Sequence, residues 1–202
     1  MRVRTWDLFV ALNLALFLAL AAAVYLARFL RYRGAASLPE FFIYACVILA
    51  VILTAWLALR HHRYPPALYA AAEAGILAHF AGAFVTIQGQ RLYDLAWIGI
   101  GYDSLVHTLN AAVGAALLSR LFADAPLQSW VRQLVVLMVV LGAGAVIEVL
   151  EFWVWLTIPN SGVGGYVNNM SDLVANLIGA GGFLAGARLL SLVRPAATAS
   201  VA

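Results

Sequence analysis

The sequence has little of what a nucleic-acid-binding protein or a disulfide-stabilised domain needs. Charged residues make up only 10% of the 202 residues, lysine is absent, and every basic residue is an arginine at the edge of an apolar run. Nucleic-acid binding usually requires a basic patch or stripe, so no nucleic-acid partner is expected. The single cysteine, Cys46, lies inside an apolar run, which excludes a disulfide framework and a thiolate metal site.

Familiar catalytic and nucleotide-binding motifs are missing as well. The chain has no Walker loop, no dinucleotide-binding glycine motif after a strand, no His-Glu-Xaa-Xaa-His and no serine-nucleophile elbow. What the chain does have is apolar sequence, because 65% of its residues are hydrophobic and its mean hydropathy is +0.95. This composition is typical of a polytopic integral membrane protein.

Apolar runs of sufficient length predict the fold class. A helix needs about 20 apolar residues to cross the hydrocarbon core of a bilayer, and six segments come near that length. The sequence therefore predicts an all-α fold, a transmembrane bundle of about six spans in one domain, 1–202. The first run is long enough to span the membrane, so it is interpreted as an uncleaved helix rather than a signal peptide. The expected spans are 8–29, 41–59, 67–86, 98–121, 134–158 and 172–193.

The distribution of arginines predicts the orientation. With an even number of spans, most arginines fall on the side of the two termini, and loops rich in arginine stay in the cytoplasm. Both termini are therefore expected in the cytoplasm, although the first outer loop carries arginines that argue the other way. The arginines on the expected cytoplasmic side are Arg2, Arg4, Arg60, Arg63, Arg120, Arg132, Arg188 and Arg194.

Polar residues form one stripe on each of the last three expected helices. Residues spaced three or four apart share a helical face, and each stripe follows this spacing. Ser171 directly precedes the sixth span and is a suitable helix N-cap. The stripes are Asp103, His107, Asn110 and Gly114 on the fourth helix, Gly144, Glu148, Glu151 and Trp155 on the fifth, and Asp172, Asn176 and Gly179 on the sixth.

Helix direction brings these stripes to the same level of the membrane. The fourth and sixth helices are expected to run inward and the fifth outward, which places Asp103, Asp172 and Glu151 near the outer helix ends. At a rise of about 1.5 Å per residue, Asp103 and Glu151 lie roughly 8 to 10 Å below the outer boundary, and His107 and Glu148 roughly 14 Å. The shared depth predicts a single polar site near the extracytoplasmic side.

The charge of this site makes a bound cation one solution. An ionised side chain deep in a bilayer costs at least about 2.5 to 3.5 kcal/mol, so such residues normally face a partner or a cavity. Four carboxylates with one histidine therefore need protons, water or a cation. Carboxylates with one imidazole suit Zn, Mn, Mg or Fe, so a divalent metal is the candidate cofactor. Candidate metal ligands are Asp103, His107 and Glu151, and candidate catalytic residues are Glu148, Asp172 and Asn176.

A purely structural role for these residues stays open. Buried acidic and amide side chains also join helices by hydrogen bonds in membranes, and the glycines of these helices favour close packing. His79 on the third expected helix could approach the same cluster. An aromatic belt at the outer membrane interface is expected from Trp97, Trp153, Trp155 and Tyr166.

Three segments carry a resemblance to known families. They read GYDSLVH at 101–107, IEVLEFW at 147–153 and MSDLVANLIGA at 170–180. Together they resemble the YjdF family of bacterial inner-membrane proteins and are similar, more distantly, to VanZ-like membrane proteins. The VanZ-like pattern usually has Gln where this chain has Glu151, which favours the YjdF family. The resemblance covers roughly the second half of the chain and implies a multi-pass protein of the bacterial inner membrane, without implying a reaction.

Three functions are compatible with these patterns. The first is an enzyme that opens to the outer leaflet and uses a metal-activated water on a lipid or lipid-linked envelope substrate. The second is a small-molecule or proton-coupled transporter, although the chain shows no internal repeat of the kind that alternating access uses. The third is a noncatalytic membrane component that binds a partner. The expected partners are membrane lipids and further copies of the chain in a homo-oligomer.

Overall fold

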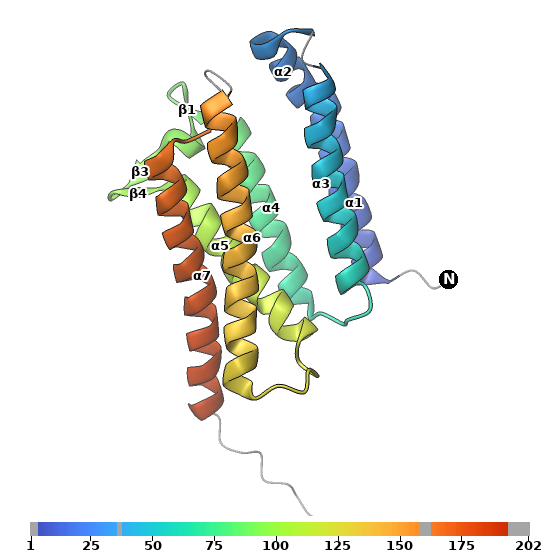
Figure 1. The fold of residues 1–202 in the computed structure, drawn as a ribbon, viewed down its shortest axis with the longest axis vertical. Helices are drawn as coiled ribbons and strands as arrows, with labels where there is room; N and C mark the ends of the chain where they lie inside the picture. Colours follow the sequence, from blue (N-terminus) through green and yellow to red (C-terminus); the bar gives the residue numbers. More distant parts are fainter. Residues whose placement is uncertain (1–3, 36–37, 158–162, 194–202) are drawn as a thin grey trace, which may run out of the picture. The chain divides into compact units, whose positions relative to one another are not determined.

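The computed structural model describes residues 4–35, 38–157 and 163–193 and separates the chain into two compact units, Met1–Arg63 and Tyr64–Ala202. Within these residues the fold is all-α with six helices, which confirms the predicted class (Figure 1). The helices that are long and apolar enough to cross a membrane are Thr5–Arg31, Pro66–Phe84, Ser129–Thr157 and Tyr166–Leu192.

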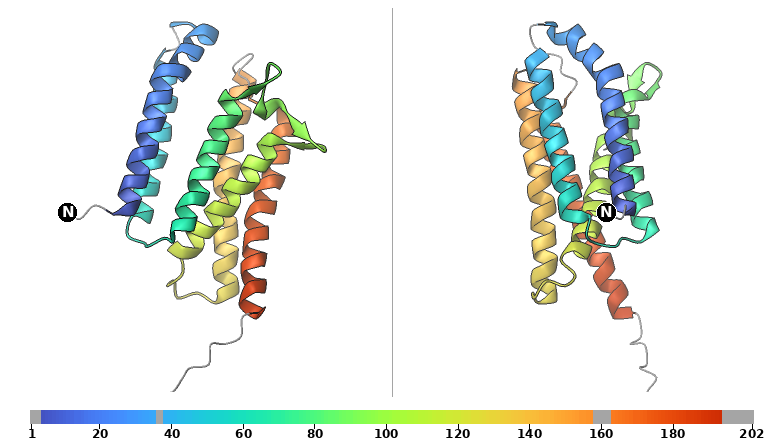
Figure 2. Two further views of the ribbon diagram at one scale, coloured as in Figure 1. Left: turned by 180° about the vertical axis from the view of Figure 1, so that it is seen from behind. Right: turned by 90° about the vertical axis from the view of Figure 1, so that its right-hand side faces the viewer.

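The first unit is a pair of long helices. Its first helix runs through three consecutive segments, α1, η1 and α2, and η1 is a π-helical turn in which the Leu26 amide donates to the Ala21 carbonyl. The second helix, α3, lies beside it in the opposite direction (Figure 2). The bounds are Thr5–Leu20 for α1, Ala21–Tyr25 for η1, Leu26–Arg33 for α2 and Leu38–Leu59 for α3.

Asp7 links the two helices of this unit. Its Oδ2 accepts a hydrogen bond from the Arg4 backbone amide at 3.0 Å, which caps the start of α1, and its Oδ1 accepts one from Trp56 Nε1 of α3 at 2.8 Å. The Arg60 guanidinium lies 4.1 Å from the centre of a Trp56 ring, in cation–π geometry. A charged residue at the end of an apolar helix therefore has partners on both helices.

The second unit is a four-helix assembly, and α5 packs against the other three helices. Pro66 begins α4, a position where its missing amide proton costs nothing. The bounds are Pro66–Phe84 for α4, Tyr102–Leu121 for α5, Ser129–Thr157 for α6 and Tyr166–Val193 for α7. Aliphatic side chains, most of them small or β-branched, fill the core between α5, α6 and α7. They are Ala111, Ala115, Val136, Val140, Ala180 and Leu184.

Two short β-hairpins connect α4 to α5, where the sequence predicted the start of a span at Ile98. The first pairs β1 (Thr86–Ile87) with β2 (Gln90–Arg91), and the second pairs β3 (Ala96–Trp97) with β4 (Ile100–Gly101). Ile98 has a φ of 54°, which no α-helix allows, so α5 begins only at Tyr102.

A 3₁₀ turn, η3 (Leu92–Asp94), joins the two hairpins. Arg91 donates to both carboxylate oxygens of Asp94, from Nε at 2.9 Å and from a guanidinium nitrogen at 2.8 Å. These hydrogen bonds and the positive charge of Arg91 hold the pKa of Asp94 below its ordinary value. The arginine of this loop therefore has a local partner.

The last helix also begins earlier than the predicted span. It starts at Tyr166 rather than Asp172, so Ser171 is not an N-cap and lies within α7, where its hydroxyl donates to the Val167 carbonyl at 2.9 Å. The earlier start places two asparagines, Asn168 and Asn169, on the helix. Position 158, the expected end of the fifth span, lies outside the described residues.

Candidate functional site

The site depends on a close approach between α5 and α7. A Cβ atom on Gly179 would overlap the Thr108 carbonyl oxygen and lie 3.0 Å from Thr108 Cα, so the two backbones approach closely at this point. The Thr108 hydroxyl donates to the Ser104 carbonyl of its own helix at 2.8 Å and to the Ala175 carbonyl of α7 at 3.3 Å. Glycine is therefore required at 179 to bring α5 and α7 together at Thr108.

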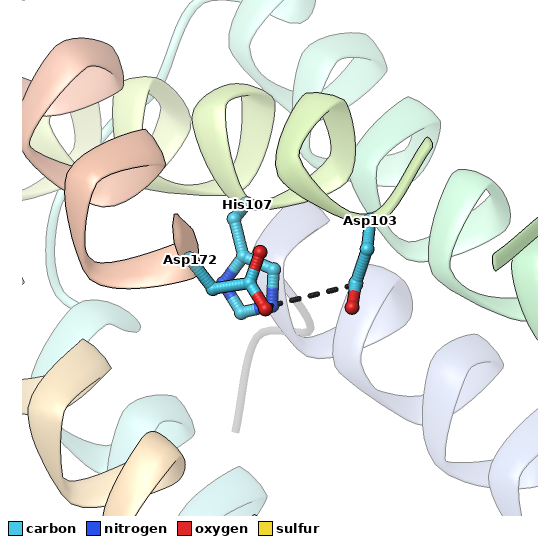
Figure 3. A group of neighbouring side chains, drawn as sticks. All are labelled: Asp103, His107 and Asp172. Atoms are coloured by element: carbon cyan, nitrogen blue, oxygen red, sulfur yellow. Dashed lines mark ion pairs between the residues drawn. The ribbon is translucent and has the colours of Figure 1, made fainter. Parts of the chain in front are cut away.

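Three ionisable side chains meet close to this contact between α5 and α7. Asp103 and His107 project from one face of α5, and Asp172 faces them from α7 (Figure 3). Nε2 of His107 lies 3.6 Å from Asp103 Oδ1 and 4.0 Å from Asp172 Oδ2. One ligand atom from each of the three lies within 4.8 Å of the others, so the group could hold a metal ion.

Glu148 of α6 lies on the other side of the imidazole. Its Oε1 is 3.5 Å from His107 Nδ1, and its side chain is only 2% exposed. This Oε1 is buried and has no hydrogen-bond partner within the described ranges. The imidazole therefore lies between carboxylates, with Nε2 directed toward the two aspartates and Nδ1 toward Glu148.

Two asparagines of α7 orient these carboxylates. The Asn168 amide nitrogen donates to Asp103 Oδ2 at 3.1 Å and to Asp172 Oδ2, while the Asn169 amide nitrogen donates to Glu148 Oε2 at 2.9 Å. Neither asparagine was predicted for the site. Asn168 precedes Asp172 by four residues and so shares its helical face, but this signal was lost because the helix was expected to start at Asp172.

Ser104 is a further site residue that the sequence analysis missed. Its hydroxyl donates to Asp172 Oδ1 at 3.4 Å, across the α5–α7 contact. Together with Asn168 it supplies hydrogen bonds to both oxygens of Asp172, which is 1% exposed. A buried carboxylate with both oxygens engaged is held in one orientation.

Two predicted site residues lie beside this group. Glu151 is half-buried and is not one of the three residues with metal-binding spacing, although its charge interacts with those of Glu148 and both aspartates. Asn176 is buried one turn after Asp172 and packs on α6, because a Cβ on Gly144 would lie 2.6 Å from its amide nitrogen. Metal binding by Glu151 and a catalytic role of Asn176 stay predictions.

His79 belongs to an aromatic group on the α4 side. Its Nδ1 lies 2.6 Å from the Tyr93 hydroxyl, and the Tyr93 ring in turn contacts the Tyr102 ring with centroids 5.9 Å apart. The Tyr102 hydroxyl donates to the Ala78 carbonyl at 2.9 Å. These contacts fix Tyr102, the first residue of α5, directly before Asp103.

The charge balance of the central group is unfavourable without a further cation or protons. Asp103, Glu148 and Asp172 surround one imidazole, and even a protonated His107 offsets only one of three negative charges. Buried charges that lack partners are costly, and carboxylates in proteins commonly meet this cost by binding a divalent cation. The group can therefore bind a metal ion or take up protons.

Comparison with known proteins gives one match. A family model described as a predicted membrane protein (DUF2238) matches residues 6–191, which include every site residue named above. No curated protein and no solved structure matched the chain.

Proposed function

The chain belongs to the DUF2238 family of predicted membrane proteins, and on that premise we propose that it binds one divalent cation between α5 and α7. The proposed ligands are Asp103, His107 through Nε2, and Asp172. Three protein ligands leave coordination positions for water or substrate, as in catalytic rather than structural metal sites. The multi-pass membrane character rests on the family and on the four long apolar helices.

The observation that carries this proposal is the position of the His107 ring. When Nε2 binds a metal, the proton must be on Nδ1. Nδ1 lies 3.5 Å from Oε1 of Glu148, a buried atom with no hydrogen-bond partner in the described part of the chain. Metal-binding histidines characteristically donate their second ring nitrogen to a carboxylate or carbonyl, which fixes the tautomer. The same geometry gives Glu148 Oε1 the hydrogen-bond donor that it otherwise lacks.

The donor chemistry limits the choice of metal. Two carboxylates and one imidazole, without a thiolate, suit Zn, Mn, Mg or Fe. Asn168 supports the ligand set because its amide donates to Oδ2 of both aspartates and does not engage Asp103 Oδ1. Each oxygen of Asp172 accepts one hydrogen bond, from Ser104 or from Asn168, and a carboxylate oxygen keeps a second lone pair for a cation. A neutral donor that holds two carboxylates together lowers the cost of their repulsion without competing with a cation for the site.

We further propose that the site is that of a metal-dependent enzyme that acts on lipid or lipid-linked envelope substrates. The metal would supply Lewis acidity and lower the pKa of a bound water. Glu151 is the remaining carboxylate near the group and is the proposed general base. Support for a lipid substrate comes from the position of the site at the start of α5 and α7, the end of these helices that would approach the membrane interface.

The proposed topology has six spans, with both termini in the cytoplasm of a bacterium and the site near the extracytoplasmic side of the inner membrane. The arginine distribution supports this orientation. Relation to the YjdF family, and more distantly to VanZ-like proteins, is part of the same proposal and rests on the three segments at 101–107, 147–153 and 170–180.

The metal proposal is tested by binding measurements on the full chain. The purified wild type, His107→Ala and His62→Ala would be stripped with chelator and titrated with Zn²⁺, Mn²⁺, Mg²⁺ and Fe²⁺ by calorimetry, with elemental analysis after gel filtration. We expect near-unit stoichiometry for at least one cation in the wild type and His62→Ala, and loss of binding in His107→Ala. Failure of the wild type to bind any of the four would overturn the proposal.

The enzymatic proposal needs a separate assay. The metal-loaded protein would be incubated with lipid esters and lipid-linked phosphates, and Glu151→Gln would be compared with the wild type. We expect turnover by the wild type and none by a variant that still binds the metal. Stoichiometric metal with no turnover on either class would contradict the enzyme and leave metal transport or a structural ion.

A further inference from the structure

The two hairpins between α4 and α5 share a backbone but differ at their tips. In each, a two-residue loop places both central residues at positive φ, with Gln88 at 52° and Gly89 at 82° in the first, and Ile98 at 54° and Gly99 at 79° in the second. This is the geometry of a type I′ turn, whose first position favours Asn, Asp or Gly. Neither Gln88 nor Ile98 is one of these residues, and Ile98 is the more strained of the two, because a β-branched residue in the left-handed region is a genuine outlier.

Among the described residues of its unit, the strained residue is also the most exposed large apolar side chain. Ile98 is 103% exposed, and its neighbours Trp97 and Ile100 are each about half exposed. Segment 95–101 contains no charged side chain, whereas the first hairpin carries Gln88, Gln90 and Arg91. An unfavourable turn residue with an apolar side chain in full exposure indicates that an apolar environment covers the tip.

The hairpin is held so that its tip points outward. The Tyr102 amide donates to the Leu95 carbonyl at 2.9 Å, and the Trp97 ring contacts the Tyr102 ring with centroids 6.2 Å apart in an edge-on arrangement. Figure 1 and the left view of Figure 2 show the β3–β4 hairpin extending away from helices α4 to α7. Its base is therefore anchored on α5, and Ile98 at its tip is fully exposed.

We propose that the β3–β4 hairpin inserts Ile98 and the Trp97 ring into the lipid of the membrane leaflet at which α5 begins. Lipid fits better than a second copy of the chain because two-residue strands offer far less area than the roughly 800 Å² per partner of a standard protein interface. Exposed Trp153, Trp155 and Tyr166 lie at the end of α6 and the start of α7, where an interfacial aromatic belt is expected. The inference does not depend on the metal proposal.

The test compares the two hairpin tips in one background. Replacing the single cysteine by Cys46→Ala allows one nitroxide label at Ile98→Cys or, as the matched control, at Gln88→Cys in the same turn position. The labelled full chain would be placed in phospholipid nanodiscs, and collision rates with apolar oxygen and a water-soluble nickel chelate would be measured by electron paramagnetic resonance. We expect position 98 to favour oxygen and position 88 to favour nickel, with ratios that differ several-fold.

Two outcomes overturn the proposal. High nickel access at position 98, equal to that at position 88, would show a tip in water, and low access to both reagents would show a protein partner. If the labelled chain does not fold, quenching of tryptophan fluorescence by bromine-labelled phospholipid provides the second measurement. Subtracting the fluorescence of Trp97→Phe from that of the wild type isolates the signal of Trp97. Strong quenching of that difference signal supports insertion, and none overturns it.

Discussion

Replacing Glu148 by glutamine is the sharpest mutational test of the proposed tautomer. In the structure Glu148 Oε1 faces His107 Nδ1, while Oε2 accepts a hydrogen bond from Asn169 at 2.9 Å. When His107 Nε2 binds a metal, both side-chain oxygens of residue 148 must accept a hydrogen bond. Glutamine offers one acceptor and one donor, so either the imidazole faces an amide donor or Asn169 loses its acceptor.

The expected loss can be estimated in two ways. Removing the carboxylate behind a metal-binding histidine typically weakens metal affinity 10–100-fold, which corresponds to about 1.4–2.8 kcal/mol. A hydrogen bond to a charged group contributes about 1.5–3 kcal/mol. Because the two estimates agree, we expect Glu148→Gln to bind the cation about 10–100-fold more weakly than the wild type.

The assay is calorimetric titration of chelator-treated protein, with Glu151→Gln as the matched control. Glu151 lies one turn further along α6, and its substitution removes the same charge from the neighbourhood without touching the imidazole. We expect a much smaller loss of affinity in this control. Equal losses in the two variants would refute the tautomer argument, because the effect would then be one of overall charge.

Substitutions at Gly179 and Asn168 test the supporting structure. Gly179→Ala should lower stability by about 1–3 kcal/mol by forcing α5 and α7 apart, whereas Gly182→Ala, where a Cβ meets nothing within 4 Å, should be neutral or stabilising in thermal unfolding; equal behaviour would contradict the close approach. Asn168→Asp should lower the melting temperature of the metal-free protein, since it replaces a bridging donor by another carboxylate, and should enlarge the increase on adding metal; an unchanged increase would contradict the ligand geometry.

Periodicity and helix direction were sufficient to predict the centre of the site. The four-residue spacing of Asp103 and His107 places them on one face of α5, and the opposite directions of α5 and α6 bring Glu148 to the same level. These relations depend only on the helical repeat and on the order of the helices. The sequence could therefore predict that Asp103, His107, Glu148, Glu151 and Asp172 lie together. The structure places Asp103, Glu148 and Asp172 around His107, and Glu151 lies beside this group.

Relations that depend on helix ends and rotation could not be predicted in the same way. The start of α7 at Tyr166 follows from no strong capping signal, so Asn168 and Asn169 were left out of the site. Glu148 and Glu151 are three residues apart, and only the packing of α6 decides which of them faces His107. A type I′ turn favours Asn, Asp or Gly where this chain has Ile98, so the β3–β4 hairpin was not recognised within the apolar run.

X-ray absorption spectroscopy of the Zn²⁺-loaded protein tests the central claim most directly, because it counts imidazole ligands. The chain has four histidines but only His107 in the proposed ligand set. The account predicts one imidazole at about 2.0–2.1 Å together with oxygen ligands, and loss of the imidazole signal in His107→Ala at a Zn²⁺ concentration that still loads the wild type. Two or more imidazoles, a sulfur ligand, or an unchanged spectrum in His107→Ala would contradict it.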